Sequence, residues 1–446
     1  MADAEPLNDA EACELTIRRA SLGVTTGRSQ ASAPLSLLSP TADELAGEAR
    51  SQGGAPAQPA ASPAGGPVAP SEQAGEASRE DHEFRNPSLP SRRRQTRAFL
   101  FALLCALRFL SAPRTAACRV RRIAYVVEVV RRAAQRAAGG THLLAFYRGV
   151  LRCGSVWECP VCMFQIRTER AKELSLAVIG WGYENVLMLS LTVRHGLGDD
   201  LRTIRAGISE AFKGVINGNP WKRFKAKFGF QYQVRALETT HGRHGWHPHL
   251  HVLFFLETPL SETELESARI WFNDRWARSV RKVLGASHVP NEHGVDLRKV
   301  NRADYLAKLG LELLDPGTKR ARGKNRTPLQ IAVGAASGKS PADEALWRTY
   351  CDAMRGAKML TWSRGLRKAA GLEDEKSDEE IANEGDALEA EEIAVLAGHV
   401  WDGVRYRPGL PCAILDAAEL APNRSDAAEA VQALIWANDF PSRSST

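Results

Sequence analysis

The segment Trp-His-Pro-His-Leu-His-Val-Leu-Phe-Phe at 246–255 carries histidines at alternate positions. Successive side chains of a β-strand point to opposite faces, so His247, His249 and His251 would share one face of a strand here. The opposite face of the strand carries the apolar residues Leu250 and Val252. Core packing gives no reason to align three imidazoles, whereas neutral imidazole commonly binds divalent metal ions. The segment therefore predicts a metal-binding strand; a polar strand face near a turn is the alternative interpretation.

The sequence around this segment predicts an α+β fold, with one antiparallel sheet and helices on one side. We expect strands where apolar residues run together or alternate, at 186–193, 230–239, 246–256 and 295–300. A glycine-containing turn at 241–245 predicts a hairpin of the second and third strands, which places the histidines on a central strand. We expect helices at 201–214, 261–284 and 302–314. Ser261 and Glu264 have the spacing of a capping box at the start of the second helix.

A third metal ligand is expected from the strand that precedes the histidines. Glu238 lies across the hairpin turn from His249 and His251. A carboxylate with imidazoles, and open positions for substrate oxygens, suits Mg²⁺ or Mn²⁺. His247 is either a ligand or a partner of one of the ligands. A surface carboxylate is the other interpretation of Glu238.

A tyrosine and a lysine lie on one face of the helix predicted at 302–314. Lys308 follows Tyr305 by three residues, a spacing at which helical side chains are neighbours. An ammonium group beside a phenol holds phosphate and favours the phenolate, so this pair is a candidate nucleophile and its phosphate-binding partner. The pattern is weak alone and gains weight next to a metal-binding strand.

Three cysteines within ten residues predict a second metal site. Cys153, Cys159 and Cys162 include one Cys-x-x-Cys pair. Such thiolates favour a structural Zn²⁺ ion with tetrahedral coordination, which requires a fourth ligand. Cys118, His142 and Cys351 are all candidates for that ligand, and the alternative is a group of buried, reduced thiols. The other cysteines are scattered, which does not fit the disulfide framework of a secreted protein.

Charge is unevenly distributed along the 446 residues. Residues 373–392 contain eleven acids and one lysine, a net charge of −10, so the rest of the chain carries +17 of the overall +7. A basic body of this kind suits a polyanion such as nucleic acid. The first thirty residues have no apolar run, and the longest one, at 99–110, is shorter than the ~20 residues that span a bilayer. We therefore expect a cytoplasmic protein without a membrane partner.

Three motifs together resemble a known enzyme superfamily. His-Leu-His-Val-Leu-Phe at 249–254 is similar to the His-hydrophobic-His motif of HUH endonucleases, Leu-Ser-Leu-Thr at 189–192 to their first motif, and Tyr-Leu-Ala-Lys at 305–308 to their tyrosine motif. More narrowly, the chain resembles the replication initiators of rolling-circle plasmids. That resemblance covers about 150–370 and rests on three stretches, at 235–253, 153–162 and 361–366.

The resemblance implies a site-specific, metal-dependent endonuclease and strand transferase. Tyr305 would link to a 5′ phosphate at the nick in origin DNA, single-stranded at that site, and the freed 3′ hydroxyl would prime rolling-circle replication. A host helicase and a DNA polymerase are the implied further partners. Some relatives carry a glutamate one helical turn before the tyrosine, where this chain has Asn301.

Five regions follow from composition and resemblance. We expect a disordered, low-complexity region at 1–97, a basic helical and cysteine-containing region at 98–180, and the HUH nicking and joining domain at 181–318. A C-terminal extension at 319–372 and an acidic segment with a C-terminal tail at 373–446 complete the chain. The alternatives are a relaxase, a single-tyrosine transposase, or a zinc-containing DNA-binding regulator without catalysis.

Overall fold

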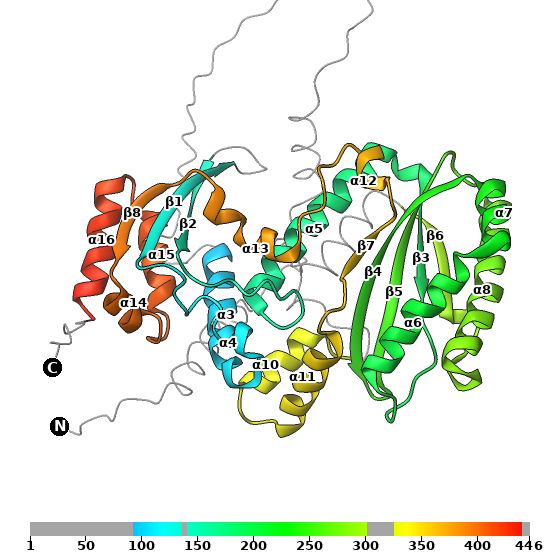
Figure 1. The fold of residues 1–446 in the computed structure, drawn as a ribbon, viewed down its shortest axis with the longest axis horizontal. Helices are drawn as coiled ribbons and strands as arrows, with labels where there is room; N and C mark the ends of the chain where they lie inside the picture. Colours follow the sequence, from blue (N-terminus) through cyan, green and yellow to red (C-terminus); the bar gives the residue numbers. More distant parts are fainter. Residues whose placement is uncertain (1–91, 136–140, 301–324, 439–446) are drawn as a thin grey trace, which may run out of the picture.

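A five-stranded antiparallel sheet carries the histidine strand (Figure 1). The computed structural model describes residues 92–135, 141–300 and 325–438. In spatial order the strands are β6 (Val295–Lys299), β3 (Val186–Leu191), β5 (Gly245–Leu256), β4 (Phe230–Gly242) and β7 (Leu360–Trp362). The α+β class, the antiparallel sheet and the central position of the histidine strand are confirmed. The sequence did not predict β7, a three-residue edge strand paired with β4.

The hairpin of β4 and β5 is confirmed, and its turn requires glycine. Gly242 pairs with Gly245, so only two residues form the turn. Gly245 has φ +88°, and a Cβ there would lie 2.9 Å from the carbonyl oxygen of Gly196. An L side chain is disfavoured on both counts. The turn thereby helps to set the register in which β4 faces β5.

Three helices cover the apolar face of this sheet. They are α6 (Leu201–Val215), α7 (Gly218–Phe228) and α8 (Glu262–Leu284). Phe254 of β5 packs in one buried cluster with Phe272 and Trp276 of α8. The capping box of Ser261 and Glu264 is present at the start of α8, as predicted. The helix predicted at 302–314 lies outside the described residues.

The opposite face is partly covered as well, which corrects the expectation of helices on one side only. Helix α5 (Pro160–Trp181) places Leu174 and Val178 in a buried cluster with Leu253 and Phe255. These two strand residues share the histidine face, which turns apolar beyond His251. One end of this face is therefore core, and the end with the histidines is more open.

A second, three-stranded sheet joins two distant parts of the chain. Its order is β2 (Thr141–Arg148), β1 (Val127–Gln135) and β8 (Glu391–Leu396), with antiparallel neighbours. Helices α14 (Gly398–Val404), α15 (Leu410–Leu420) and α16 (Arg424–Trp436) pack against it. The residues from β8 to α16 thus share a buried core with β1 and β2, whereas the sequence suggested an acidic segment followed by a tail.

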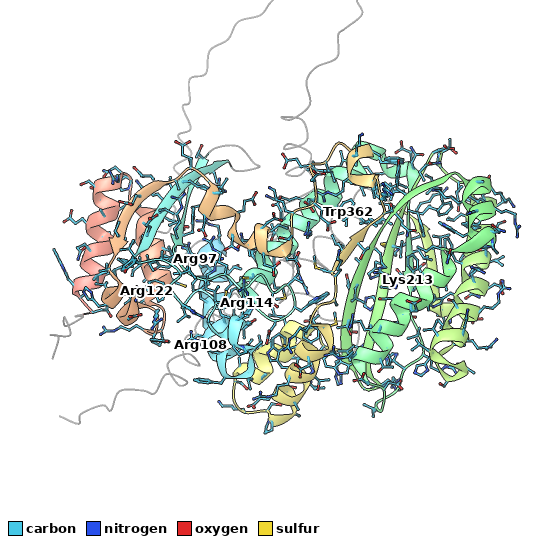
Figure 2. The ribbon with its side chains drawn as sticks, in the orientation of Figure 1. Arg97, Arg108, Arg114, Arg122, Lys213 and Trp362 are labelled. Carbon is cyan, nitrogen blue, oxygen red and sulfur yellow. The ribbon has the colours of Figure 1, made fainter. Side chains whose placement is uncertain are left out.

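The basic N-terminal part is only partly helical. Helix α3 (Arg92–Ala106) begins inside the region expected to be disordered, while residues 1–91 lie outside the described residues. Arg131 and Arg132 fall in the region expected to be basic and helical, but they lie on β1. Valines at 126, 127, 129 and 130 favour a strand here, and pairing with β2 and β8 satisfies its backbone. Arg97 of α3, which Figure 2 labels, pairs with Glu419 of α15 at 2.7 Å.

Further helices and turns complete the described part of the chain. They are α4 (Pro113–Ala116), α10 (Pro328–Ala336), α11 (Pro341–Met354), α12 (Leu366–Ala369), α13 (Asp378–Ala387) and the 3₁₀ turns at 108–110, 183–185, 286–288 and 292–294. The acidic run contributes α13, which packs on α5. Among the described helices, none combines the length and apolar character needed to cross a membrane.

Trp401 tests whether the C-terminal residues belong to the folded core. Its side chain is fully buried, and its ring centroid lies 4.8 Å from that of Tyr147. The Nε1 of Trp401 donates to the carbonyl oxygen of Val120 at 2.9 Å. We expect Trp401→Ala to lower the free energy of unfolding by about 3–5 kcal/mol, as for other buried aromatics. Urea unfolding followed by circular dichroism measures this. Trp436→Ala, at a side chain that is 73% exposed, is the matched control and should change little; equal effects of the two variants would contradict the assignment.

Candidate metal centres

Glu238, His249 and His251 meet on one face of the five-stranded sheet. Glu238 of β4 lies directly opposite His249 of β5 in the strand register. The Oε2 of Glu238 lies 3.1 Å from the Nε2 of His249 and 3.6 Å from the Nε2 of His251. One potential ligand atom of each residue lies within 4.8 Å of those of the other two residues, so the three could hold a metal ion. The structure therefore brings together the three residues that the sequence singled out.

A residue that sequence reasoning missed fixes the orientation of His251. Ser190 of β3 pairs with His251 in the register, and its Oγ lies 2.9 Å from the Nδ1 of that ring. The hydroxyl of Ser190 forms a hydrogen bond with the Nδ1 of His251, and the Nε2 of that ring faces Glu238. Outer partners of this kind fix the tautomer of metal-binding histidines. The available signal was the single hydroxyl in the otherwise apolar segment 186–191.

The electrostatics of the cluster favour an ionised carboxylate. Burial acts to raise the pKa of Glu238, but attraction to His251 and hydrogen bonds with His249 and His251 outweigh it. The pKa of Glu238 is therefore held well below its ordinary range. An anionic oxygen with two imidazole nitrogens is a donor set that suits a divalent cation.

His247 lies beside this group but is not among the residues whose ligand atoms converge. Its ring stacks on His195 with centroids 4.6 Å apart. Burial, followed by the charges of His249 and His195, lowers the pKa of His247 to about 3. The imidazole is thus neutral near pH 7. Tyr305 and Lys308 lie outside the described residues.

Four cysteines form a second group, which is fully buried. The Sγ of Cys118 lies 3.6 Å from that of Cys162 and 3.7 Å from that of Cys159, and Cys153 lies 3.8 Å from Cys162. Tetrahedral coordination with Zn–S bonds of about 2.3 Å places sulfur atoms about 3.8 Å apart. These spacings fit a Zn²⁺ ion, and the group could hold one.

The structure selects Cys118 as the fourth member of this group, in place of His142 or Cys351. Cys159 is the N-cap of α5, and Cys162 lies in the first turn of that helix. Hydrogen bonds with Cys118, Cys153 and Cys159 hold the pKa of Cys162 well below its ordinary range, so a thiolate is favoured there. Because Cys118 lies far from the others in sequence, their spacing alone could not identify it.

Comparisons with known proteins support a plasmid Rep-like chain. The chain is 28% identical to the protein named "Protein rep" of Streptomyces lividans over 348 residues, which cover 62% of this chain and 73% of that protein. It is also 28% identical to a neomycin resistance protein of Streptomyces cyanogenus over 192 residues, which cover 34% of this chain and 43% of that protein. No protein-family model and no solved structure matches the chain.

Substitution of Cys118 tests the four-cysteine site. We expect protein purified without added zinc to contain about one Zn²⁺ per chain, as in closed structural sites. Cys118→Ser should remove most of this zinc and destabilise the fold, because metal binding at such a site contributes folding free energy. Cys351→Ala, which changes another buried thiol, should keep the zinc. Elemental analysis and thermal melting measure both; normal zinc content in Cys118→Ser would refute the assignment.

Titration with Mn²⁺ tests the carboxylate–histidine cluster. Calorimetry on protein that retains its zinc should show one further site, lost in the His249→Ala/His251→Ala double variant. Ser190→Ala should weaken Mn²⁺ binding by about 10–100-fold, since it removes the hydroxyl that orients His251. Ser267→Ala, at an exposed serine of α8, is the control and should bind normally. Unchanged Mn²⁺ binding in the double variant would exclude these ligands.

Proposed function

We propose that this chain is a plasmid replication initiator of the HUH type that nicks one strand of its origin and rejoins it. The observation that carries the proposal is the convergence of Glu238, His249 and His251 on the central strand. Their side chains keep 17%, 14% and 16% of their surface exposed, so a phosphate oxygen can reach them. The similarity to a Rep protein and the tyrosine motif at 305–308 support the same reaction.

Each part of the chain has a defined task in this proposal. Glu238, His249 and His251 hold a Mg²⁺ or Mn²⁺ ion, and Ser190 fixes the ring of His251. When bound, such an ion polarises the scissile phosphate and neutralises its developing charge. Lys308 binds a non-bridging phosphate oxygen and stabilises the phenolate of Tyr305. The four-cysteine group serves as a structural zinc site.

The proposed chemistry exchanges one phosphoester for another. The phenolate oxygen of Tyr305 attacks phosphorus in line, the Oη–P bond forms, and the bond from phosphorus to the 3′ oxygen breaks. The proton lost by the phenol of Tyr305 passes to solvent, and the leaving 3′ oxygen takes up a proton from solvent and becomes the hydroxyl that primes synthesis. Attack by a 3′ hydroxyl on the phosphotyrosine reverses these steps, which rejoins the strand and restores the phenol.

Replacement of the nucleophile is the most direct test. With Mn²⁺, the chain should nick a supercoiled plasmid that carries its own origin and form a covalent adduct with the 5′ end of the nicked strand. Tyr305→Phe should abolish the adduct, because the ring without its hydroxyl has no nucleophile, and should keep DNA binding. Denaturing gel electrophoresis of end-labelled DNA measures the adduct.

Tyr406→Phe is the matched control for this experiment. That tyrosine is 48% exposed on the part of the chain that packs on the three-stranded sheet, and its variant should form the adduct normally. A Tyr305→Phe protein that still forms the adduct would disprove the assignment of the nucleophile. Wild-type protein that binds origin DNA and never cleaves it would instead favour a regulator without catalysis.

A further inference from the structure

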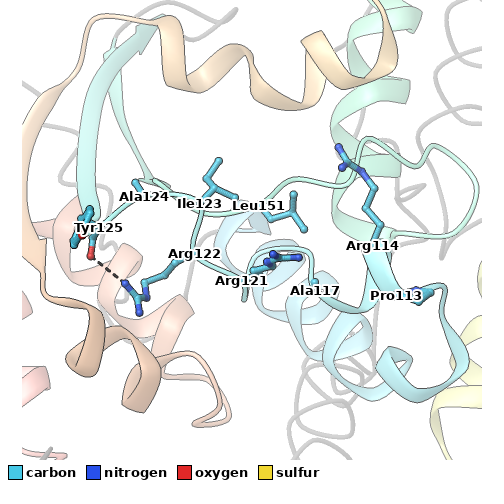
Figure 3. Close-up of a pocket in the computed structure, with 9 residues that line it drawn as sticks. All are labelled: Pro113, Arg114, Ala117, Arg121, Arg122, Ile123, Ala124, Tyr125 and Leu151. Atoms are coloured by element: carbon cyan, nitrogen blue, oxygen red, sulfur yellow. Dashed lines mark hydrogen bonds between the residues drawn. The ribbon is translucent and has the colours of Figure 1, made fainter.

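An open groove of about 810 Å³ lies outside both metal centres (Figure 3). We propose that this groove binds single-stranded DNA. The identity of this ligand rests on the proposed function. Five residues define this arginine groove in the argument below: Arg114, Arg121, Arg122, Ile123 and Tyr125. They belong to α4 and to the segment between α4 and β1, which connects the parts of the molecule that carry the two sheets (Figure 1).

The arginine groove is strongly basic. Its nine lining residues include three arginines and no acid. Arg114 and Arg121 are exposed. Asp402 lies 3.6 Å from Arg122, but it also lies 2.9 Å from Arg405, so one carboxylate faces two guanidinium groups. The groove therefore retains positive charge, and guanidinium groups at such a surface bind phosphate well.

Two apolar side chains beside these arginines lie in solvent. The side chain of Tyr125 is 96% exposed and that of Ile123 is 60% exposed. Exposed aromatic and aliphatic groups interleaved with arginines are the pattern of a surface that stacks bases while binding the backbone. Bases in a duplex are already stacked on each other, so this surface favours a single strand.

The segment that carries these residues is held rigidly. Four of the five residues follow shortly after Cys118, a member of the four-cysteine group, and Arg119 next to it has φ 60°, which an L residue seldom adopts. Arg119 N donates to Leu151 O at 2.7 Å, Leu151 N donates to Arg121 O at 2.8 Å, and Ile123 N donates to Gly149 O at 2.9 Å. A fixed segment loses little entropy on binding, which raises affinity.

Fluorescence anisotropy with a labelled oligothymidylate, longer than the ~4–16 nucleotides that such sites cover, tests the groove. The assay uses the full chain with its zinc, without Mg²⁺ or Mn²⁺. Tyr125→Ala should weaken binding about fivefold or more, and Tyr125→Phe should restore it, because the ring and not the hydroxyl stacks. Arg121→Ala/Arg122→Ala should lower the slope of log affinity against log salt by about 1.4, the value for two lost phosphate contacts on a single strand.

The matched control removes two charges elsewhere. Lys222→Ala/Arg223→Ala changes exposed residues of α7, which packs on the apolar face of the five-stranded sheet, and should keep the slope near that of the wild type. The single variant Arg121→Glu, at an exposed side chain, lowers the charge of the groove and leaves the contact between Arg122 and Asp402 in place. It therefore separates the effect of charge from the loss of that contact. Melting temperatures verify that each variant is folded.

The outcomes separate this inference from the proposed nicking activity. Weaker binding in the groove variants supports the groove whether or not the wild-type protein cleaves DNA. Absence of cleavage with groove-dependent binding would reject only the nicking activity. Unchanged affinity in both Tyr125→Ala and Arg121→Ala/Arg122→Ala, or equal competition by a duplex of the same length, would overturn the groove as a single-strand site.

Discussion

The register of β5 between β4 and β3 is the constraint on which the candidate site depends. Glu238 faces His249 from one neighbour and Ser190 faces His251 from the other. Because side chains on a strand alternate, a slip of one residue would turn Glu238 or Ser190 to the apolar face and expose a core residue. Burial of Phe254 against α8 opposes such a slip, and so does the two-residue turn before Gly245. The packing of the apolar face thus fixes the chemistry of the other face.

The four-cysteine group couples this sheet to the rest of the molecule. Cys118 and Cys153 come from two segments that pair beside the three-stranded sheet, whereas Cys159 and Cys162 begin α5. The other end of α5 packs on the histidine face of the five-stranded sheet, at Leu253. A Zn²⁺ ion at the cysteines would therefore fix the start of a helix whose end supports the candidate site. Metal binding at such a position contributes to the folding of both parts.

Local patterns predicted the parts of the structure that depend on local physics. The alternation at 246–256, the turn glycine and the capping box of Ser261 each act within a few residues, and each is present. The errors concern contacts that are distant in sequence. Residues 127–135, in a region expected to be helical, form a strand that pairs with β2 and, from more than 250 residues away, with β8. Spacing in the sequence left Cys118 as one of three candidates for the fourth ligand of the cysteine group, and only the fold selects it. Spacing and composition carry no information about such partners.

The charged residues also form contacts that are distant in sequence, and these contacts change the argument from net charge to a polyanion as partner. Several acidic residues at 373–392 form ion pairs with buried arginines. Asp386 pairs with Arg152 at 2.7 Å, Glu391 with Arg131 at 2.8 Å and Asp378 with Arg170 at 3.2 Å, and all three arginines are buried. Buried guanidinium groups need such partners, because an unpaired charge in the core is strongly destabilising. These arginines are therefore structural, and any attraction to a polyanion has to come from exposed cations such as Arg121, so the local distribution of charge matters more here than the net value.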